Sequence, residues 1–102
     1  MKLTEPEFTL GVEEEYLLVD RDTRDLVSDP PEELMRECAA LCGEQVSPEL
    51  MRSQIEIGTT VCRDVSQAEA EIKRLRGIIS RVSNQYNYAP IAVSTHPFAR
   101  WM

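Results

Sequence analysis

The sequence predicts a small α+β or α/β domain in which helices cover one face of a sheet. Several segments alternate apolar and polar side chains, as strands do, and two others carry apolar residues three and four apart, as amphipathic helices do. The expected order is strand, turn, short strand, helix, strand, long helix, strand. With 102 residues, 42% of them hydrophobic, the chain fits one domain with its own core.

The first strand is expected over residues 8–19. One register of this segment is apolar, and it contains Phe8, Leu10, Val12, Tyr16 and Leu18. Glu14 falls in the same register, and the pattern leaves open whether it lies near a sheet edge or meets a cation. A polar turn over residues 20–25 follows, and residues 26–28 are expected to pair back as a short strand.

The first helix is expected to begin near Asp29, which is a typical N-cap residue. Pro30 suits the first helical position, Glu32 completes a capping box, and Gly43 ends the helix. Its expected buried stripe contains Leu34, Met35, Cys38, Leu41 and Cys42. A break at residues 47–48 then separates this helix from the next strand.

The second long strand is expected over residues 51–62 and the second helix behind a capping box of Ser66 and Glu69. In the strand, Glu56 shares a face with residues 54, 58 and 60. The helix has a clear apolar stripe formed by Ala68, Ile72, Leu75, Ile79, Val82 and Tyr86. Pro90 is expected to stop the helical region, and residues 91–95 to form the last strand.

Composition excludes several classes of partner. The net charge of −7 disfavours nucleic acid and anionic membrane surfaces. Apolar runs are too short for a transmembrane helix, and no signal stretch follows the first residues, so a cytoplasmic location is expected. The three cysteines Cys38, Cys42 and Cys62 are expected to be buried, reduced thiols, because an odd count argues against a disulfide framework.

A group of acidic residues and one histidine are candidate metal ligands. Glu13 and Glu15 share one face of the first strand, Glu56 lies between two isoleucines, and His96 follows the last strand. Glu49 precedes Glu56 by seven residues and is placed to reach the same face. Carboxylates on apolar strands are costly to bury without a partner, so this set points to a Mg²⁺ or Mn²⁺ site that manages phosphates.

Plainer interpretations of the same residues stay open. Alternating charges are common on the solvent-facing side of an antiparallel strand. Arg52 and Arg63 are alternative partners that would turn the carboxylates into structural ion pairs. A single histidine such as His96 is more often a structural residue than a ligand. The scattered glycines form no phosphate-binding loop.

Taken together, the motifs resemble those of a known family. Their order is Thr9–Tyr16, Glu49–Leu50, Gln54–Ile57, Val61–Asp64 and Thr95–Phe98. This series is similar to the N-terminal part of the carboxylate–amine ligase family, the type 2 glutamate–cysteine ligases, which are related in fold to glutamine synthetase. The resemblance runs from about Phe8 onward and implies that residues 1–102 are the N-terminal part of one glutamine-synthetase-like catalytic domain, with a mixed or antiparallel sheet that is incomplete here.

The resemblance implies an ATP-dependent ligase. ATP, as co-substrate, phosphorylates a carboxylate, typically the γ-carboxylate of glutamate, and an amine such as that of cysteine attacks the acyl phosphate to form an amide. By motif, Glu15, Glu49 and Glu56 would hold one Mg²⁺ or Mn²⁺ ion, and Glu13 and His96 would belong to a neighbouring site. The partners implied are ATP and amino-acid substrates.

Proteins of this family are longer than this chain, so the chain is expected to be a cut piece that carries part of a site and is inactive alone. An exposed sheet edge would favour a homo-oligomer. Two other functions stay open. One is a metal-binding or regulatory module without chemistry, and the other is a metal-independent interaction domain.

Overall fold

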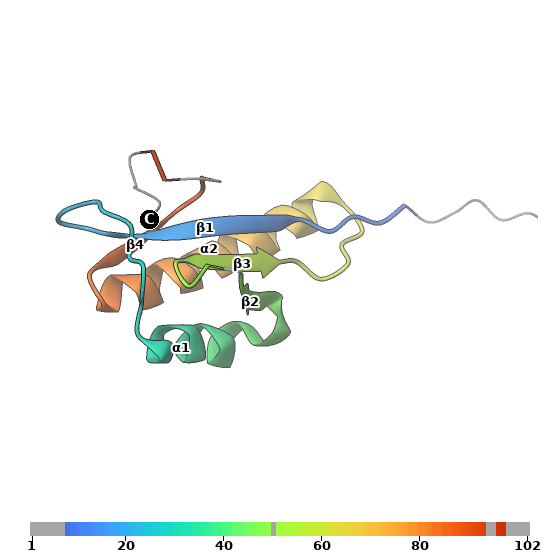
Figure 1. The fold of residues 1–102 in the computed structure, drawn as a ribbon. Coiled ribbons are helices and arrows are strands. Elements are labelled where there is room, and N and C mark those ends of the chain that lie inside the picture. The colour runs from blue at the N-terminus through green and yellow to red at the C-terminus, as the bar shows by residue number, and fades with distance from the viewer. Residues whose placement is uncertain (1–7, 50, 94–95, 98–102) are drawn as a thin grey trace, which may run out of the picture.

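An antiparallel sheet of four strands organises the structure, a computed structural model that describes residues 8–49, 51–93 and 96–97. The strands, given in spatial order, are β2 (Val46–Pro48), β3 (Gln54–Gly58), β1 (Glu13–Asp20) and β4 (Tyr88–Ile91). Every neighbouring pair is antiparallel. The long strand β1 therefore lies inside the sheet, with β2 and β4 at its edges (Figure 1).

Two helices, α1 (Glu32–Cys42) and α2 (Val65–Gln85), pack on the same face of this sheet (Figure 1). A short 3₁₀ turn, Gly43–Gln45, links α1 to β2. The core lies between helices and sheet and contains Tyr16, Leu18, Leu34, Cys38, Cys42, Val46, Ile55, Ile57, Ile72, Leu75, Ile78, Ile79 and Val82. The expected α+β class with helices on one face is confirmed.

The second half of β1 is buried on both faces. Tyr16 and Leu18 point toward the helices and belong to the core. Leu17 and Val19 alternate with them and face the other side of the sheet, yet their exposed fractions are 2% and 6%. Apolar residues thus occupy both registers of this strand over four positions.

Glu14, the carboxylate in the apolar register, meets a cation from α2. Its Oε1 accepts a hydrogen bond from Arg76 Nε at 2.7 Å, and its Oε2 pairs with Arg76 Nη2. The hydroxyl of Tyr16 also donates to Glu14. The hydrogen bond from Arg76 is the main reason that the pKa of Glu14 is lowered. The question that the sequence left open is therefore answered by a contact between β1 and α2.

Both helix starts differ from the expected ones. The N-cap of α1 is Pro31, without a side-chain cap, and the Asp29 carboxylate pairs with Arg52. The N-cap of α2 is Asp64, two residues before the expected Ser66, and it accepts a hydrogen bond from Gln67 N at 2.8 Å. The expected end of α1 is confirmed, since Gly43, with φ of +61°, follows the helix directly.

Strand boundaries also differ. The expected strand over residues 51–62 is regular only from Gln54 to Gly58, and the expected break at residues 47–48 falls inside β2. Pro90 lies inside β4 rather than before it. An edge strand tolerates proline, because the backbone N–H groups on its outer side have no strand partner. Residues 94–95 of the expected last strand lie outside the described residues. The short strand expected at residues 26–28 is a single bridge between Leu26 and Val19.

The cysteines are free and buried, as expected. Burial is the main reason that the pKa of the Cys38 thiol rises to about 11, which keeps this thiol protonated at neutral pH. Leu41 departs from the expected stripe of α1, because its side chain is 57% exposed. No helix among the described residues has the length and apolar character needed to cross a bilayer.

The cap of α2 gives a test of the fold. Asp64→Ala is expected to lower the free energy of unfolding by about 1 kcal/mol, because the backbone N–H of Gln67 loses its acceptor at the helix start. Urea unfolding followed by circular dichroism measures the change. Ser66→Ala is the matched control and should cost much less, so a comparable loss in both variants would contradict this cap assignment.

Candidate metal centre

Three carboxylates from neighbouring strands meet on one face of the sheet. Glu15 of β1 lies directly opposite Glu56 of β3, and Ser47 of β2 lies opposite Glu56 on its other side. Glu49 follows Ser47 by two residues, so the alternation of an extended chain turns it to the same face. One oxygen from each of Glu15, Glu49 and Glu56 lies within 4.8 Å of the other two.

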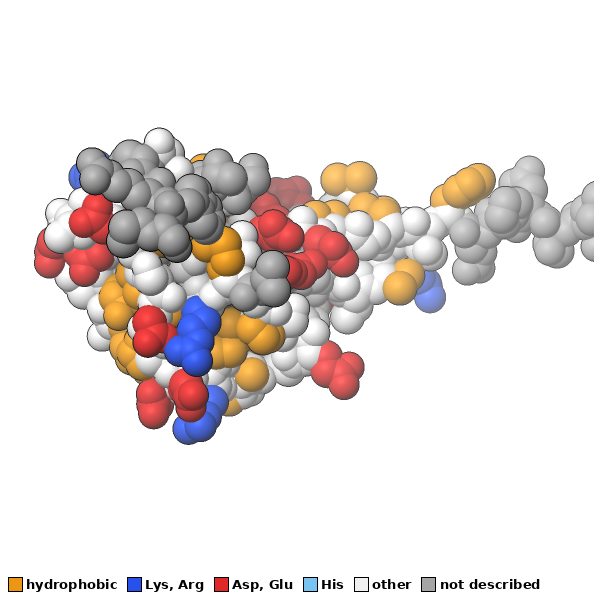
Figure 2. Space-filling view, viewed as in Figure 1, with side chains coloured by type: hydrophobic (Ala, Val, Ile, Leu, Met, Phe, Trp, Pro, Cys, Tyr) orange, Lys and Arg blue, Asp and Glu red, His pale blue; other side chains and the backbone are white. Residues whose placement is uncertain are grey.

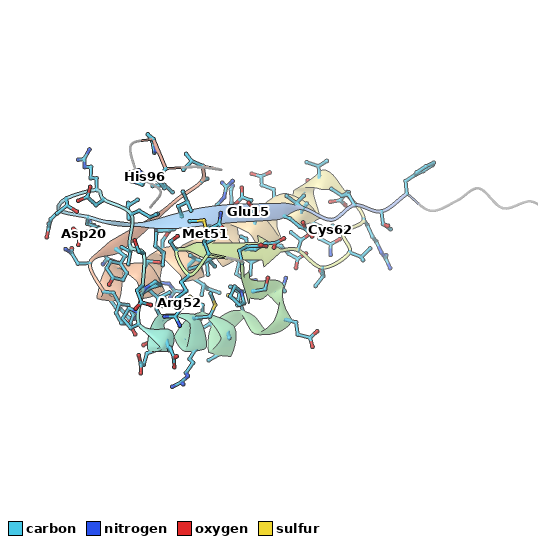
Figure 3. All side chains as sticks on the ribbon, in the orientation of Figure 1. Glu15, Asp20, Met51, Arg52, Cys62 and His96 are labelled. Atoms are coloured by element: carbon cyan, nitrogen blue, oxygen red, sulfur yellow. The ribbon has the colours of Figure 1, made fainter. Side chains whose placement is uncertain are left out.

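This face is the one that the helices leave uncovered. Ile55 and Ile57, which flank Glu56, are fully buried in the core between sheet and helices. Glu56 therefore points to the opposite side, where Glu15 is exposed and the other two carboxylates are half-buried. Figure 2 shows acidic side chains gathered near the N-terminal end of β1, and Figure 3 labels Glu15 on that strand.

The charges of the cluster raise the pKa of Glu56 to about 7. The largest cause is a hydrogen bond with Glu49, which favours the protonated form. Partial burial and the negative charges of Glu49 and Glu13 act in the same direction. Negative groups that raise the pKa of a neighbouring carboxyl in this way would also favour a cation beside it.

Arginine partners do not neutralise the cluster within the part of the chain that the structure describes. Arg52, one of the alternatives raised by the sequence, pairs with Asp29. None of the ion pairs among the described residues includes Glu15, Glu49 or Glu56. The interpretation of these residues as structural ion pairs therefore lacks support from the contacts.

The donor set fits a hard divalent cation. Carboxylate oxygens are preferred ligands of Mg²⁺ and Mn²⁺. Oxygens that bind one Mg²⁺ at about 2.0–2.1 Å lie at most about 4.2 Å apart. The observed spread of up to 4.8 Å exceeds this only slightly, so small rotations of glutamate side chains would close the set around an ion. Among the described residues it is the one group of three or more such ligands.

Glu13 flanks the cluster, and His96 lies apart from it. Glu13 pairs across the sheet with Gly58, and its Cγ lies 3.8 Å from where a Cβ on Gly58 would stand. The His96 side chain is buried, with its Nε2 2.9 Å from the carbonyl oxygen of Arg24. Figure 3 places His96 away from Glu15, toward the Asp20 end of β1. A second site made by Glu13 and His96 stays a prediction.

An antiparallel sheet with helices on one face and a carboxylate cluster on the other defines the class of molecule: a domain with a candidate divalent-cation centre on an open sheet face. Residues 9–102 match the family described as Glutamate-cysteine ligase family 2 (GCS2). The chain belongs to this family.

Relatives named "Putative glutamate--cysteine ligase 2" are similar over nearly the whole chain. The one from Paracoccus denitrificans is 55% identical over 97 residues, which cover 95% of this chain and 26% of the relative. The one from Rhodospirillum rubrum is 48% identical, covering 97% and 26%. The one from Chloroflexus aggregans is 43% identical, covering 93% and 24%. The chain thus spans about a quarter of the length of these relatives.

Removing one carboxylate tests the centre. Glu56→Gln is expected to raise the thermal midpoint at pH 8 without metal, because it relieves repulsion within the cluster. Mn²⁺ or Mg²⁺ should stabilise the wild type by about 2.7 kcal/mol at a hundred times its Kd. The variant should lose most of this gain. Thermal unfolding with and without each ion measures both effects.

The matched control is Glu33→Gln, which makes the same chemical change at an exposed position of α1 on the helix side of the sheet. It should respond to metal as the wild type does. An equal metal response of Glu56→Gln and wild type would contradict the assignment of the cluster as the binding site.

Proposed function

We propose that this chain supplies a metal-binding part of an ATP-dependent carboxylate–amine ligase of the glutamate–cysteine type. The observation that carries the proposal is the convergence of Glu15, Glu49 and Glu56 on the open face of the sheet, in a chain that belongs to the glutamate–cysteine ligase family 2. Residues 1–102 would then be the N-terminal part of a larger catalytic domain, and ATP, an acidic amino acid and an amine its substrates.

The overall reaction joins two substrates through an acyl phosphate. The carboxylate of the acid attacks the γ-phosphorus of ATP and ADP leaves, after which the amine attacks the acyl carbon and phosphate leaves. Mg²⁺ or Mn²⁺, when bound, neutralises charge on the phosphoryl group during transfer. The part of this chain would be to hold the cation: Glu15 and Glu56 offer oxygens from two paired strands, and Glu49 offers one from the residue that follows β2.

The face of the sheet that the helices leave uncovered is where the nucleotide phosphates would bind. The helices cover the opposite face, so Glu15, Glu49 and Glu56 would hold a cation on the side of the sheet away from α1 and α2. Mg²⁺ retains several coordination positions for water and phosphate oxygens. The cluster brings no lysine or arginine into ion-pair distance within the described residues, so basic groups for the phosphates would come from other parts of the enzyme.

A second candidate is a metal-binding module without chemistry. It is favoured by the lack of an ion pair between the cluster and any Lys or Arg of the described residues, because phosphoryl transfer normally combines metal with Lys or Arg. The two candidates differ in turnover. Both bind metal through Glu56, and only the first makes Glu56 necessary for release of ADP.

A chimera tests the ligase proposal. The matching segment of the Paracoccus denitrificans relative, 55% identical, is replaced by this chain. We expect ADP release that requires ATP, Mg²⁺, glutamate and cysteine. Glu56→Gln in the chimera should lower kcat by about 100-fold or more, since charge stabilisation of the transition state is lost. The 102-residue chain alone should release no ADP.

The unmodified relative and a Glu33→Gln chimera are the controls, and both should be active. An active relative with an inactive chimera would contradict the proposal. Full activity of the Glu56→Gln chimera would remove the cluster from the reaction. ADP release that needs glutamate and ignores cysteine would keep the ligase class and assign a different amine.

A further inference from the structure

We infer that Arg76 is a positioning residue for the candidate metal centre: by holding Glu14 on the helix side of β1, it decides that Glu13 and Glu15 face the cation site. The inference rests on the proposed metal-binding role of the cluster. It concerns the register of β1. Through its contacts with Glu14, Arg76 controls this register from outside the cluster.

The start of β1 is ambiguous by sequence. Glu13, Glu14 and Glu15 are consecutive, and in a strand a one-residue slip exchanges the two faces. The correct register turns Glu13 and Glu15 outward, while the slipped one turns only Glu14 outward. Because Glu15 must lie opposite Glu56 to complete the cluster, a slip would take it apart.

The second half of β1 does little to exclude this slip. Tyr16, Leu17, Leu18 and Val19 are all buried, two on each face. A one-residue shift would place Leu17 where Leu18 now lies, so the centre of the strand would present leucine to the core in either register. Register is strongly specified where one face is apolar and the other polar, and this half of β1 lacks that contrast.

At the start of β1, Arg76 makes the two faces of the strand different. Its guanidinium makes a two-point contact with both carboxylate oxygens of Glu14, with Nε at 2.7 Å from Oε1, and the Tyr16 hydroxyl donates to the same carboxylate. The Glu14 side chain is only 18% exposed, so a slip would leave a partly buried charge without its partner. A planar guanidinium also fixes the direction of the carboxylate, which a lysine does not.

Arg76 is itself held in place by α2. The preceding residue, Leu75, and Ile79 one turn further are fully buried in the core. The packing of α2 on the core therefore fixes the position of Arg76 beside the start of β1. Through its contact with Glu14, Arg76 influences the residues that β1 presents on the opposite face of the sheet. Signals in the sequence were the misplaced Glu14 and an arginine four residues after the buried Ile72.

The test compares Arg76→Met with wild type in the 102-residue chain. Cross-strand NMR contacts between Glu15 and Glu56, and between Tyr16 and Ile55, report the register without any metal. Mn²⁺ affinity, measured by paramagnetic resonance well below the unfolding temperature, reports the site. We expect Arg76→Met to weaken the contacts of residues 13–16, to add a second set, and to lower Mn²⁺ affinity by about 10-fold or more.

Two further variants separate positioning from stability. Lys73→Met removes an exposed ion pair with Glu69 from the same helix and should leave register and affinity unchanged. Glu14→Leu combined with Arg76→Met replaces the ion pair by an apolar contact that also belongs on the helix side, so it should restore both. If Arg76→Met acted only by lowering the stability of the whole chain, adding Glu14→Leu would not restore Mn²⁺ affinity.

A single wild-type register and unchanged Mn²⁺ affinity in Arg76→Met would overturn the inference. If that variant does not fold, Arg76→Lys replaces it: loss of the two-point contact should lower affinity several-fold, and wild-type behaviour would overturn the inference equally. Failure of the wild type to bind Mn²⁺ would refute the metal centre, while the register measurement would still decide the role of Arg76.

Discussion

The register between β1 and β3 is the constraint on which the rest of the structure depends. With Glu15 opposite Glu56, the isoleucines on either side of Glu56 enter the core and the carboxylates leave it. The same alternation that buries apolar side chains under the helices therefore builds the cluster on the other face. Neighbouring strands lie about 4.8 Å apart, which is close to the spacing that ligands of one cation require.

The cluster is unfavourable for the protein without a cation. Glu49 and Glu13 raise the pKa of Glu56, so at neutral pH the folded chain holds negative charges together that the unfolded chain would separate. Because the pKa of Glu56 is raised in the folded chain, its contribution to folding stability declines as the pH rises from the ordinary pKa of a glutamate toward about 7. Sheet and core supply the compensation, since β1, β3 and α2 contribute most of the buried apolar side chains. Like charges held together with a shifted pKa are typical of functional sites.

Local patterns in the sequence predicted much of this. Alternation placed Glu15 and Glu56 on polar faces, and the stripe of α2 identified Ile72, Leu75 and Ile79 as core. What the sequence could not supply was the pairing of distant segments. Whether Glu14 meets Arg76, 62 residues away, depends on how α2 crosses the sheet. The start of α1 shows the same limit: Asp29 is a good cap residue by type, but its carboxylate contacts Arg52, 23 residues away, and Pro31 is the N-cap.

The site that would combine His96 with Glu13 stays a prediction. The motif resemblance groups His96 with Glu13, and in the structure the His96 ring contacts the carbonyl oxygen of Arg24, toward the Asp20 end of β1. The carboxylates need only the sheet to bring them together, because each sits on or next to a paired strand. His96 lies beyond β4, so its position depends on how the chain continues past the last pairing contact. The three-carboxylate cluster is thus a property of the sheet itself, while a second centre would need contacts that the sheet does not impose.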